Sequence, residues 1–196
     1  PLFFAHVRAA TGTAVTRQNC HPFASGRWLF MHNGFVGSWN RLRRKVEALI
    51  PDPLYPSRIG TTDSEAVFLA IVGAGVERDP VRATSKVLRE LCRLVNEDGL
   101  RERMRFTSAL SNGEDLYAFR FAENDSANSL YYRESGDEVI AVSEPFDKDS
   151  EWIEVPADHV LIARASQRAQ VVPIPHDNFV SHQQEHATFQ RVVGRN

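Results

Sequence analysis

The hydrophobic pattern of this chain changes its period near the middle, and no other feature constrains the fold as strongly. In residues 39–97 the apolar side chains recur at three- and four-residue spacing, which is typical of helices with one buried face. From residue 105 onward, short apolar runs alternate with turn residues such as those at 111–113 and 135–136, which is typical of antiparallel strands. Strands on both sides of a group of helices predict an α+β fold with stacked antiparallel sheets and the helices outside.

Three helices are expected. The first covers 39–50, with Ser38 as its cap and Pro51 and Pro53 ending it. The second begins at 61–65, where Thr62 and Glu65 match a capping box. The third covers 80–97, with Asp79 as cap and a proline at its first position.

Strands are expected on both sides of these helices, and a polar tail follows them. The predicted strands cover 2–9, 27–31, 105–110, 116–121, 130–133, 139–142, 152–155 and 160–165. We therefore expect one domain over 1–175 and a polar, aperiodic C-terminal tail over 176–196. The unpaired edges of the sheets could pair with a second copy of the chain, so a homodimer is compatible with this fold.

Charge and cysteine content narrow the classes of function. A net charge of −2 over 196 residues gives no footprint for nucleic acid. No apolar stretch approaches the roughly 20 residues that span a bilayer. The two cysteines form no framework of disulfides and no CxxC motif, which favours a reducing compartment, and we expect a cytoplasmic protein.

The apolar run Trp28–Met31 leads into His32-Asn33-Gly34, and this sequence has two interpretations. Asn-Gly commonly turns a β-hairpin, because both residues tolerate positive φ. The alternative is that Asn33 presents its amide and Gly34 its bare backbone N–H side by side, as an oxyanion hole requires. Taken alone, the dipeptide favours the hairpin.

Other polar residues also carry two interpretations. Arg8, in a largely apolar segment, needs an anion, which is either an internal carboxylate or that of a ligand. Asp63 either caps a helix or accepts a ligand ammonium.

Cys20 and His21 are adjacent, so on an extended segment their side chains point to opposite faces. A packing role for Cys20 is therefore favoured over a nucleophile–base pair. A metal site built from the histidines at 6, 21 and 32 lacks ligand spacing, so a structural role is favoured for each and no metal is expected.

Four motifs occur in order: HxRxAT at 6–11, NxHPF at 19–23, HNG at 32–34 and TDSE at 62–65. Together they resemble the class II glutamine amidotransferases, which are N-terminal-nucleophile hydrolases with a four-layer αββα sandwich. The segment Ser143–Phe146 and the form of NxHPF look most like the stand-alone bacterial branch, which includes enzymes cleaving γ-glutamyl amides in ergothioneine biosynthesis.

The resemblance implies a role for each matching residue. Arg8 would hold the α-carboxylate of the substrate with help from Thr11, and Asp63 its α-ammonium. Asn33 and Gly34 would form the oxyanion hole. The substrate would be glutamine or a γ-glutamyl amide, no cofactor would be needed, and the ammonia could pass to a separate synthase subunit.

The nucleophile of this family is an N-terminal cysteine, which would lie upstream of Pro1 together with the first strands of the fold. Without it the chain would not turn over by itself. Two other functions remain as alternatives. One is a non-catalytic subunit that binds a glutamine-like ligand or a partner protein, and the other is a metal-dependent hydrolase that uses the histidines.

Overall fold

The computed structural model describes residues 2–7, 16–97, 99, 104–123, 127–136, 138–148 and 151–175. Its helices are α1 (Trp39–Glu47), α2 (Asp63–Gly73) and α3 (Pro80–Glu97), with short 3₁₀ turns at Arg17–Asn19 and Tyr55–Ser57. Its strands are β1 (Phe23–Ser25), β2 (Trp28–Phe35), β3 (Arg105–Ser111), β4 (Leu116–Ala122), β5 (Tyr131–Ser135), β6 (Glu138–Val142), β7 (Ile153–Glu154), β8 (His159–Ala163) and β9 (Gln170–Pro173).

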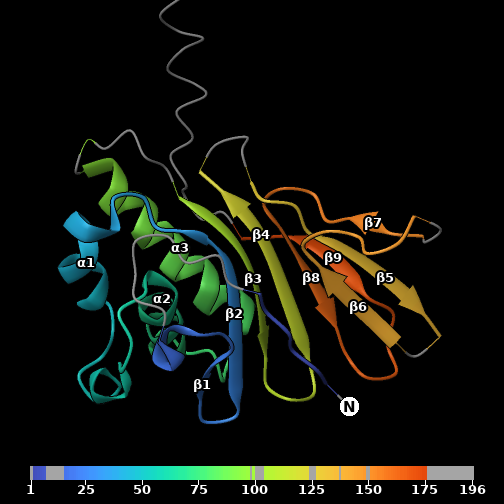
Figure 1. The fold of residues 1–196 in the computed structure, drawn as a ribbon, viewed down its shortest axis with the longest axis horizontal. Helices are drawn as coiled ribbons and strands as arrows, with labels where there is room; N and C mark the ends of the chain where they lie inside the picture. The colour runs from blue at the N-terminus through green and yellow to red at the C-terminus, as the bar shows by residue number, and fades with distance from the viewer. Residues whose placement is uncertain are drawn as a thin grey trace, which may run out of the picture.

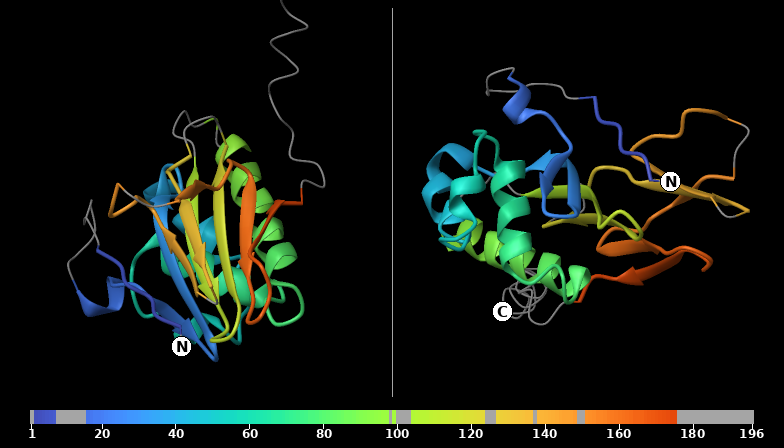
Figure 2. Two further views of the ribbon diagram at one scale, coloured as in Figure 1. Left: turned by 90° about the vertical axis from the view of Figure 1, so that its right-hand side faces the viewer. Right: turned by 90° about the horizontal axis from the view of Figure 1, so that it is seen from below.

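The strands form two antiparallel sheets. The larger has the order β1-β2-β3-β4-β8-β9, and the smaller has the order β6-β5-β7. The three helices cover one side of the larger sheet, and the smaller sheet lies on the other side (Figure 1). Seen from the right of that view, the strands of the smaller sheet lie in front of the larger sheet and the helices behind it (Figure 2). The predicted α+β sandwich is confirmed, and the described residues supply a helical layer and both sheets.

Alternation along the strands gives the larger sheet two different faces. Toward the helices it presents Phe30, Phe106 and Phe119, all 1% exposed or less. Phe30 stacks on Phe68 of α2 with ring centroids 5.3 Å apart. Toward the smaller sheet, small side chains such as Ala118 pack in a separate apolar cluster with Leu130. The helices and the smaller sheet therefore close on opposite sides of the same strands.

Several predicted elements are confirmed. Helix α3 has the predicted bounds, and Asp79 Oδ1 accepts a hydrogen bond from Arg82 N at 2.9 Å. Helix α2 follows Thr62, whose hydroxyl accepts from Glu65 N at 3.3 Å. The six strands expected after residue 105 all occur, with shifted ends, whereas β1 and β9 were not predicted. None of the described helices has both the length and the apolar character needed to cross a bilayer.

The strand predicted at 2–9 is wrong over its described part. Residues 2–7 form no strand, and Phe3 and Val7 are 86% and 99% exposed. An extended apolar segment becomes a strand only where a neighbour accepts its backbone hydrogen bonds. None of the described strands pairs with residues 2–7.

The first helix begins at Trp39 after Ser38, as predicted, but its predicted end at residue 50 is wrong. The backbone of Ser38 is in the left-handed region (φ 52°, ψ 40°), and its side chain makes no capping hydrogen bond. Its backbone carbonyl accepts hydrogen bonds from Arg41 N and Leu42 N. The helix ends at Glu47, before the prolines. Ser38 therefore occupies the predicted cap position, but it lacks the side-chain hydrogen bond expected of a serine cap.

Candidate active site

Strand β2 continues through Asn33 and Gly34 instead of turning there. Asn33 pairs with Thr107 and Gly34 with Phe106 of β3. The hairpin interpretation is therefore wrong. Strand β1 reaches only residues 28–30 of β2, so from Met31 to Phe35 only β3 among the described strands pairs with it. Alternate backbone groups of this stretch therefore face away from β3, at an open edge of the sheet.

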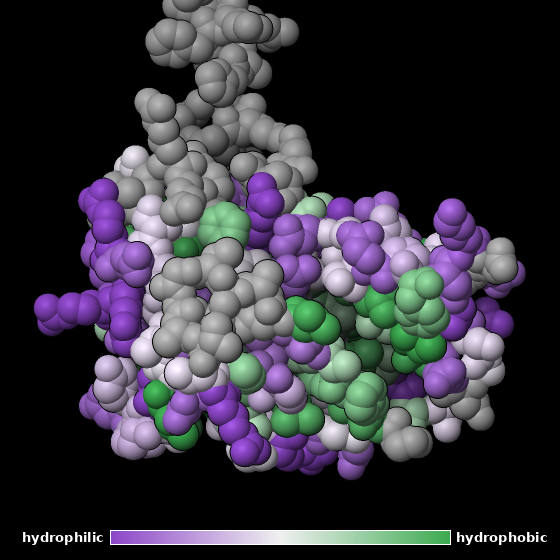
Figure 3. All heavy atoms as spheres, in the orientation of Figure 1, coloured by the Kyte–Doolittle hydropathy of each residue, from purple (hydrophilic) through white to green (hydrophobic). Residues whose placement is uncertain are grey.

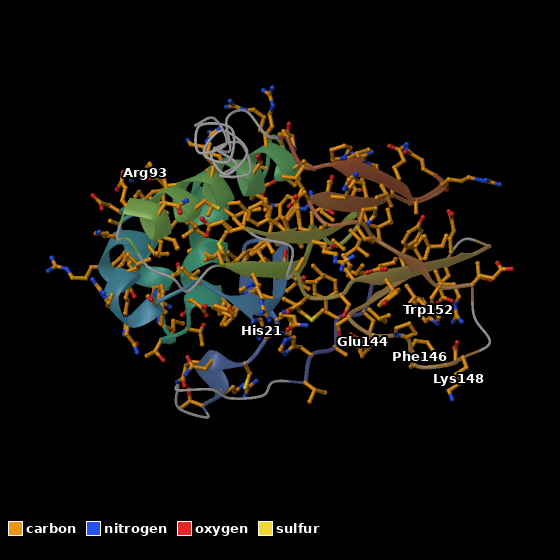
Figure 4. All side chains as sticks on the ribbon, turned by 90° about the horizontal axis from the view of Figure 1, so that it is seen from above. His21, Arg93, Glu144, Phe146, Lys148 and Trp152 are labelled. Atoms are coloured by element: carbon orange, nitrogen blue, oxygen red, sulfur yellow. The ribbon has the colours of Figure 1, made fainter. Side chains whose placement is uncertain are left out.

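A cleft of about 1080 Å³ opens beside this edge. Its walls come from residues 5–7, the end of β2, the middle of β3, the starts of α1 and α2, and the end of β6 with the segment after it. Apolar side chains gather around a hollow to the right of centre in Figure 3. The lining residues include Ala5, His6, Val7, His21, Met31, Asn33, Gly34, Asn40, Arg41, Asp63, Ser64, Thr107, Ala109, Ala118, Val142, Ser143 and Glu144. Seen from above, His21 and Glu144 lie on the same side of the molecule, away from Arg93 (Figure 4).

The side chain of Asn33 is exposed to this cleft. Its Oδ1 accepts a hydrogen bond from Asn128 Nδ2 at 3.2 Å, and its backbone carbonyl accepts from the same nitrogen at 3.1 Å. Its own amide nitrogen, Nδ2, has no acceptor in the part of the chain that the structure describes. The oxygen of the Asn33 amide is therefore already hydrogen-bonded, while its nitrogen remains a donor toward the cleft.

Gly34 stands where no side chain fits. A Cβ at this position would lie 2.1 Å from the carbonyl oxygen of Arg105 and 2.6 Å from His32 Nε2. Both contacts are far below any real Cβ distance, and one is to backbone. Glycine is thus required by the close approach of the β3 backbone and the His32 ring, and Gly34 lines the cleft beside Asn33.

Asp63 joins the end of β2 to the start of α2. Its Oδ2 accepts from Val36 N and its Oδ1 from Ser64 N, both at 2.8 Å. The helix cap is Thr62, so the interpretation of Asp63 as the capping residue is wrong. Asp63 lines the cleft while its carboxylate holds the two segments that form one wall.

His32 is only 4% exposed and belongs to the same wall of the cleft. Its Nε2 donates to the Arg105 carbonyl at 3.3 Å, so Nδ1 accepts from the Ser64 hydroxyl at 2.9 Å. Burial lowers the pKa of His32, which favours this neutral form. The predicted structural role of His32 agrees with these contacts, which tie β2 to α2 and β3.

The loop before α2 is held by two further side chains. Asn19, 2% exposed, accepts from Thr61 N at 2.9 Å. Glu65 accepts from Ile59 N at 2.9 Å and Gly60 N at 2.8 Å, and forms an ion pair with Arg58. Glu65 does not reach back to Thr62, so only half of the expected capping box forms. These contacts fix the loop that carries Asp63 into the cleft wall.

Two of the other candidates, His6 and His21, line the same cleft. The rings of His6 and His21 lie with centroids 4.2 Å apart and are tilted by 39°, but no three His, Cys, Asp or Glu side chains of the described residues gather as a metal site would need. Cys20 is exposed, its Sγ lies 3.4 Å from the Thr16 carbonyl, and it does not line the cleft. Its predicted packing role is therefore wrong. Arg8, Thr11 and the predicted tail 176–196 lie outside the described residues.

The sequence did not single out Asn128, which contacts Asn33 from a loop 95 residues away along the chain. No motif surrounds it, and such a long-range contact leaves no periodic signal. Glu144 was noted only as part of a motif, and it lines the cleft with Ser143.

The fold is the sandwich expected from the sequence, and the cleft brings together residues of the HNG and TDSE motifs. The sequence model of the glutamine amidotransferases class-II matches residues 1–134. The chain therefore belongs to the class II glutamine amidotransferases.

Individual relatives agree with this assignment. The Saccharomyces cerevisiae protein named probable glutamine amidotransferase DUG3 is 25% identical over 200 residues, covering 82% of this chain and 56% of its own length. The gamma-glutamyl-hercynylcysteine sulfoxide hydrolase of Mycolicibacterium smegmatis is 30% identical over 161 residues, covering 82% and 59%. This chain thus spans less than two thirds of these two relatives.

One solved structure is similar over most of its length. It is a glutamine aminotransferase class-II domain protein from Silicibacter pomeroyi, with a TM-score of 0.76 and 36% identity, covering 83% of this chain and 74% of that one. The likeness extends the family assignment to the arrangement of the sheets and helices.

Proposed function

We propose that the whole protein hydrolyses the side-chain amide of glutamine or of a γ-glutamyl compound in the cleft beside Asn33. The observation that carries this proposal is the amide nitrogen of Asn33, which faces the cleft and has no acceptor among the described residues. Gly34 follows directly, with no side chain over its backbone. An amide donor and a backbone N–H side by side can stabilise the oxyanion of a tetrahedral intermediate.

The rest of the substrate would be held by its two charges. Asp63 lines the same cleft and would accept the α-ammonium group. Arg8 and Thr11 would bind the α-carboxylate, and residues 5–7, which directly precede Arg8, line the cleft. A planar guanidinium can bind a carboxylate through two parallel hydrogen bonds.

The nucleophile would be an N-terminal cysteine upstream of Pro1, with its own α-amino group as base. The thiolate attacks the amide carbon, and the oxyanion forms against Asn33 and Gly34. The C–N bond then breaks, the amine leaves with a proton from the ammonium base, and a γ-glutamyl thioester remains. Water attacks the thioester and releases glutamate and the thiol. No cofactor takes part in these steps.

The remaining features of the proposal concern the whole protein. Residues 1–175 would form the amidotransferase domain and 176–196 a polar tail outside it. The protein would act in the cytoplasm. It would either release its ammonia or amine to solvent or pass ammonia to a separate synthase subunit, and it could do so as a homodimer.

The test uses the full-length protein with glutamine and with a γ-glutamyl amide. Glutamate release should be observed, and a diazoketone analogue of glutamine should add once, at a cysteine, as intact mass and peptide mapping can show. Ligand binding without turnover and without an adduct would instead favour a non-catalytic binding subunit. Activity that follows the metal content of the sample would favour a metal-dependent hydrolase.

A further inference from the structure

Asn128 lies just before β5, and its side chain makes an unusual contact with Asn33. A single donor nitrogen, Asn128 Nδ2, is shared between the backbone carbonyl of Asn33 at 3.1 Å and its side-chain Oδ1 at 3.2 Å. One group therefore fixes both the main chain and the side chain of the same residue.

Asn128 is in turn anchored across the sheet. Its backbone carbonyl accepts from Thr107 Oγ1 at 3.1 Å and from Arg120 Nε at 3.0 Å. Thr107 is the partner of Asn33 on β3, and Arg120 is the partner of Thr107 on β4. Arg120 also donates to the Val155 carbonyl at 2.6 Å. The loop that carries Asn128 is thus tied to neighbouring positions on all three strands.

The chemical consequence concerns which end of the Asn33 amide faces the cleft. An asparagine amide can rotate by half a turn, which exchanges its donor nitrogen for its acceptor oxygen. A developing oxyanion is stabilised by the donor and repelled by the oxygen. Because Asn128 supplies a donor, it retains Oδ1 on its own side and leaves Nδ2 toward the cleft.

We propose that Asn128 is a positioning residue, which holds the Asn33 amide with its nitrogen toward the reacting carbonyl. This inference rests on the proposed function, since it assigns a role to the support of the same oxyanion hole. Asn128 is not among the residues lining the cleft, so it would act through Asn33 and not on the substrate.

The decisive experiment is a double-mutant cycle in the full-length protein. Asn128→Ala removes the shared donor but keeps the backbone carbonyl that Thr107 and Arg120 bind. We expect kcat to fall about tenfold with KM within about twofold, as for the loss of one hydrogen bond that acts in the transition state. In an Asn33→Ala background, the same substitution should change kcat by less than about twofold.

Two further variants separate positioning from a structural role. Asn128→Asp keeps the shape but turns an acceptor toward both oxygens of Asn33, so kcat should fall at least as far as with alanine. Asn112→Ala removes an asparagine whose Oδ1 accepts from Glu114 N and Asp115 N in the β3–β4 turn, and should leave kcat unchanged. Thermal unfolding of each variant checks that the protein folds.

Three results would overturn the inference. These are a kcat within about twofold of wild type for Asn128→Ala, recovery by Asn128→Asp, or losses that multiply in the double variant. A different result bears on the proposed function itself: full turnover in Asn33→Ala would remove Asn33 from the mechanism, whatever Asn128 does.

Discussion

The two faces of the β2–β3 pair are built from alternate residues of the same strands, but one face packs in the core and the other lines the cleft. On the helix side, Phe30 and Phe106 are 0% and 1% exposed, and Phe30 packs against both Phe106 and Phe68 of α2. On the cleft side, their neighbours along the strands, Met31 and Thr107, line an open space of about 1080 Å³ with Asn33. One strand pair thus supplies both the core and the candidate site.

The two faces together explain how the amide nitrogen of Asn33 can be oriented toward the cleft without an acceptor among the described residues. The helix-side contacts fix the strand positions, because close-packed aromatic rings tolerate little movement. The cleft side then needs only a few polar contacts, such as those of Asn128 and Asp63, to orient its groups. We expect substitutions on the helix side to change stability and those on the cleft side to change turnover.

The largest effect should come from Phe106→Ala on the helix side. Removal of this 1% exposed ring leaves a cavity against Phe30 and Phe119 and should lower the free energy of unfolding by about 3–5 kcal/mol. Denaturant unfolding measures it. Phe146→Ala is the matched control, because this ring is 66% exposed, and a loss below about 1 kcal/mol is expected there. Equal losses in the two variants would contradict the assignment of the core.

Asn33→Ala should have the opposite signature. We expect kcat to fall by about two to three decades, equivalent to about 2.7–4 kcal/mol in the barrier, with little change in KM or in unfolding. Steady-state glutamate release by the full-length protein measures this. Asn40→Ala, also at the cleft but on α1, should stay within about twofold of wild type. Near-normal turnover in Asn33→Ala would contradict the comparison between the faces.

Gly34→Ala should lower both stability and turnover, because Gly34 lines the cleft and is also closely packed against β3. The added methyl would lie 2.1 Å from the Arg105 carbonyl, so β2 and β3 must move apart. We expect the free energy of unfolding to fall by about 1–3 kcal/mol, as in other overpacked sites, and kcat to fall with it. A variant as stable and as active as wild type would show that the strands are less closely packed than described.

The smallest effect is a pH dependence of stability from His32. Burial, the largest cause, lowers the pKa of His32 in the folded state, so below about pH 6.5 the unfolded chain binds a proton that the folded chain does not. The neutral, buried His32 therefore contributes fully to the free energy of unfolding above that pH, and this contribution is lost as the pH falls toward the lowered pKa. The free energy of unfolding changes by at most about 1.4 kcal/mol per pH unit for one proton.

Unfolding of wild type and His32→Gln from about pH 8 to pH 5 measures this difference. The wild-type curve should fall more steeply on the acid side, because the variant has no titrating group at this position. Parallel curves would mean that His32 does not titrate differently in the two states.

Local patterns predicted the parts of the fold that local interactions determine. Helix α3 has its own cap and stripe, and it was predicted with correct bounds. The first segment, 2–7, could not be predicted, because a strand there depends on a neighbouring strand. The cap position of Ser38 was predicted, but its left-handed backbone and missing side-chain bond were not. Strand β9 pairs with β8 and has too short an apolar pattern to stand out alone.

Sequence motifs singled out some residues of the candidate site, but not the residues that hold them from distant parts of the chain. The motifs singled out Asn33, Gly34 and Asp63, which line one cleft, and their roles stay predictions. Their supports, Asn128 and the buried contact between His32 and Ser64, join segments far apart in the sequence. Nothing in the local pattern distinguishes such residues from ordinary loop or strand positions.

A crystal structure of the full-length protein with a γ-glutamyl adduct trapped by the diazoketone analogue would show where the substrate carbonyl binds. We expect the adduct to occupy the cleft, with its carbonyl oxygen about 2.7–3.1 Å from both Asn33 Nδ2 and Gly34 N. We also expect its ammonium group to contact Asp63. An adduct whose oxygen lies away from Asn33, or one bound outside this cleft, would contradict an oxyanion hole at Asn33 and Gly34.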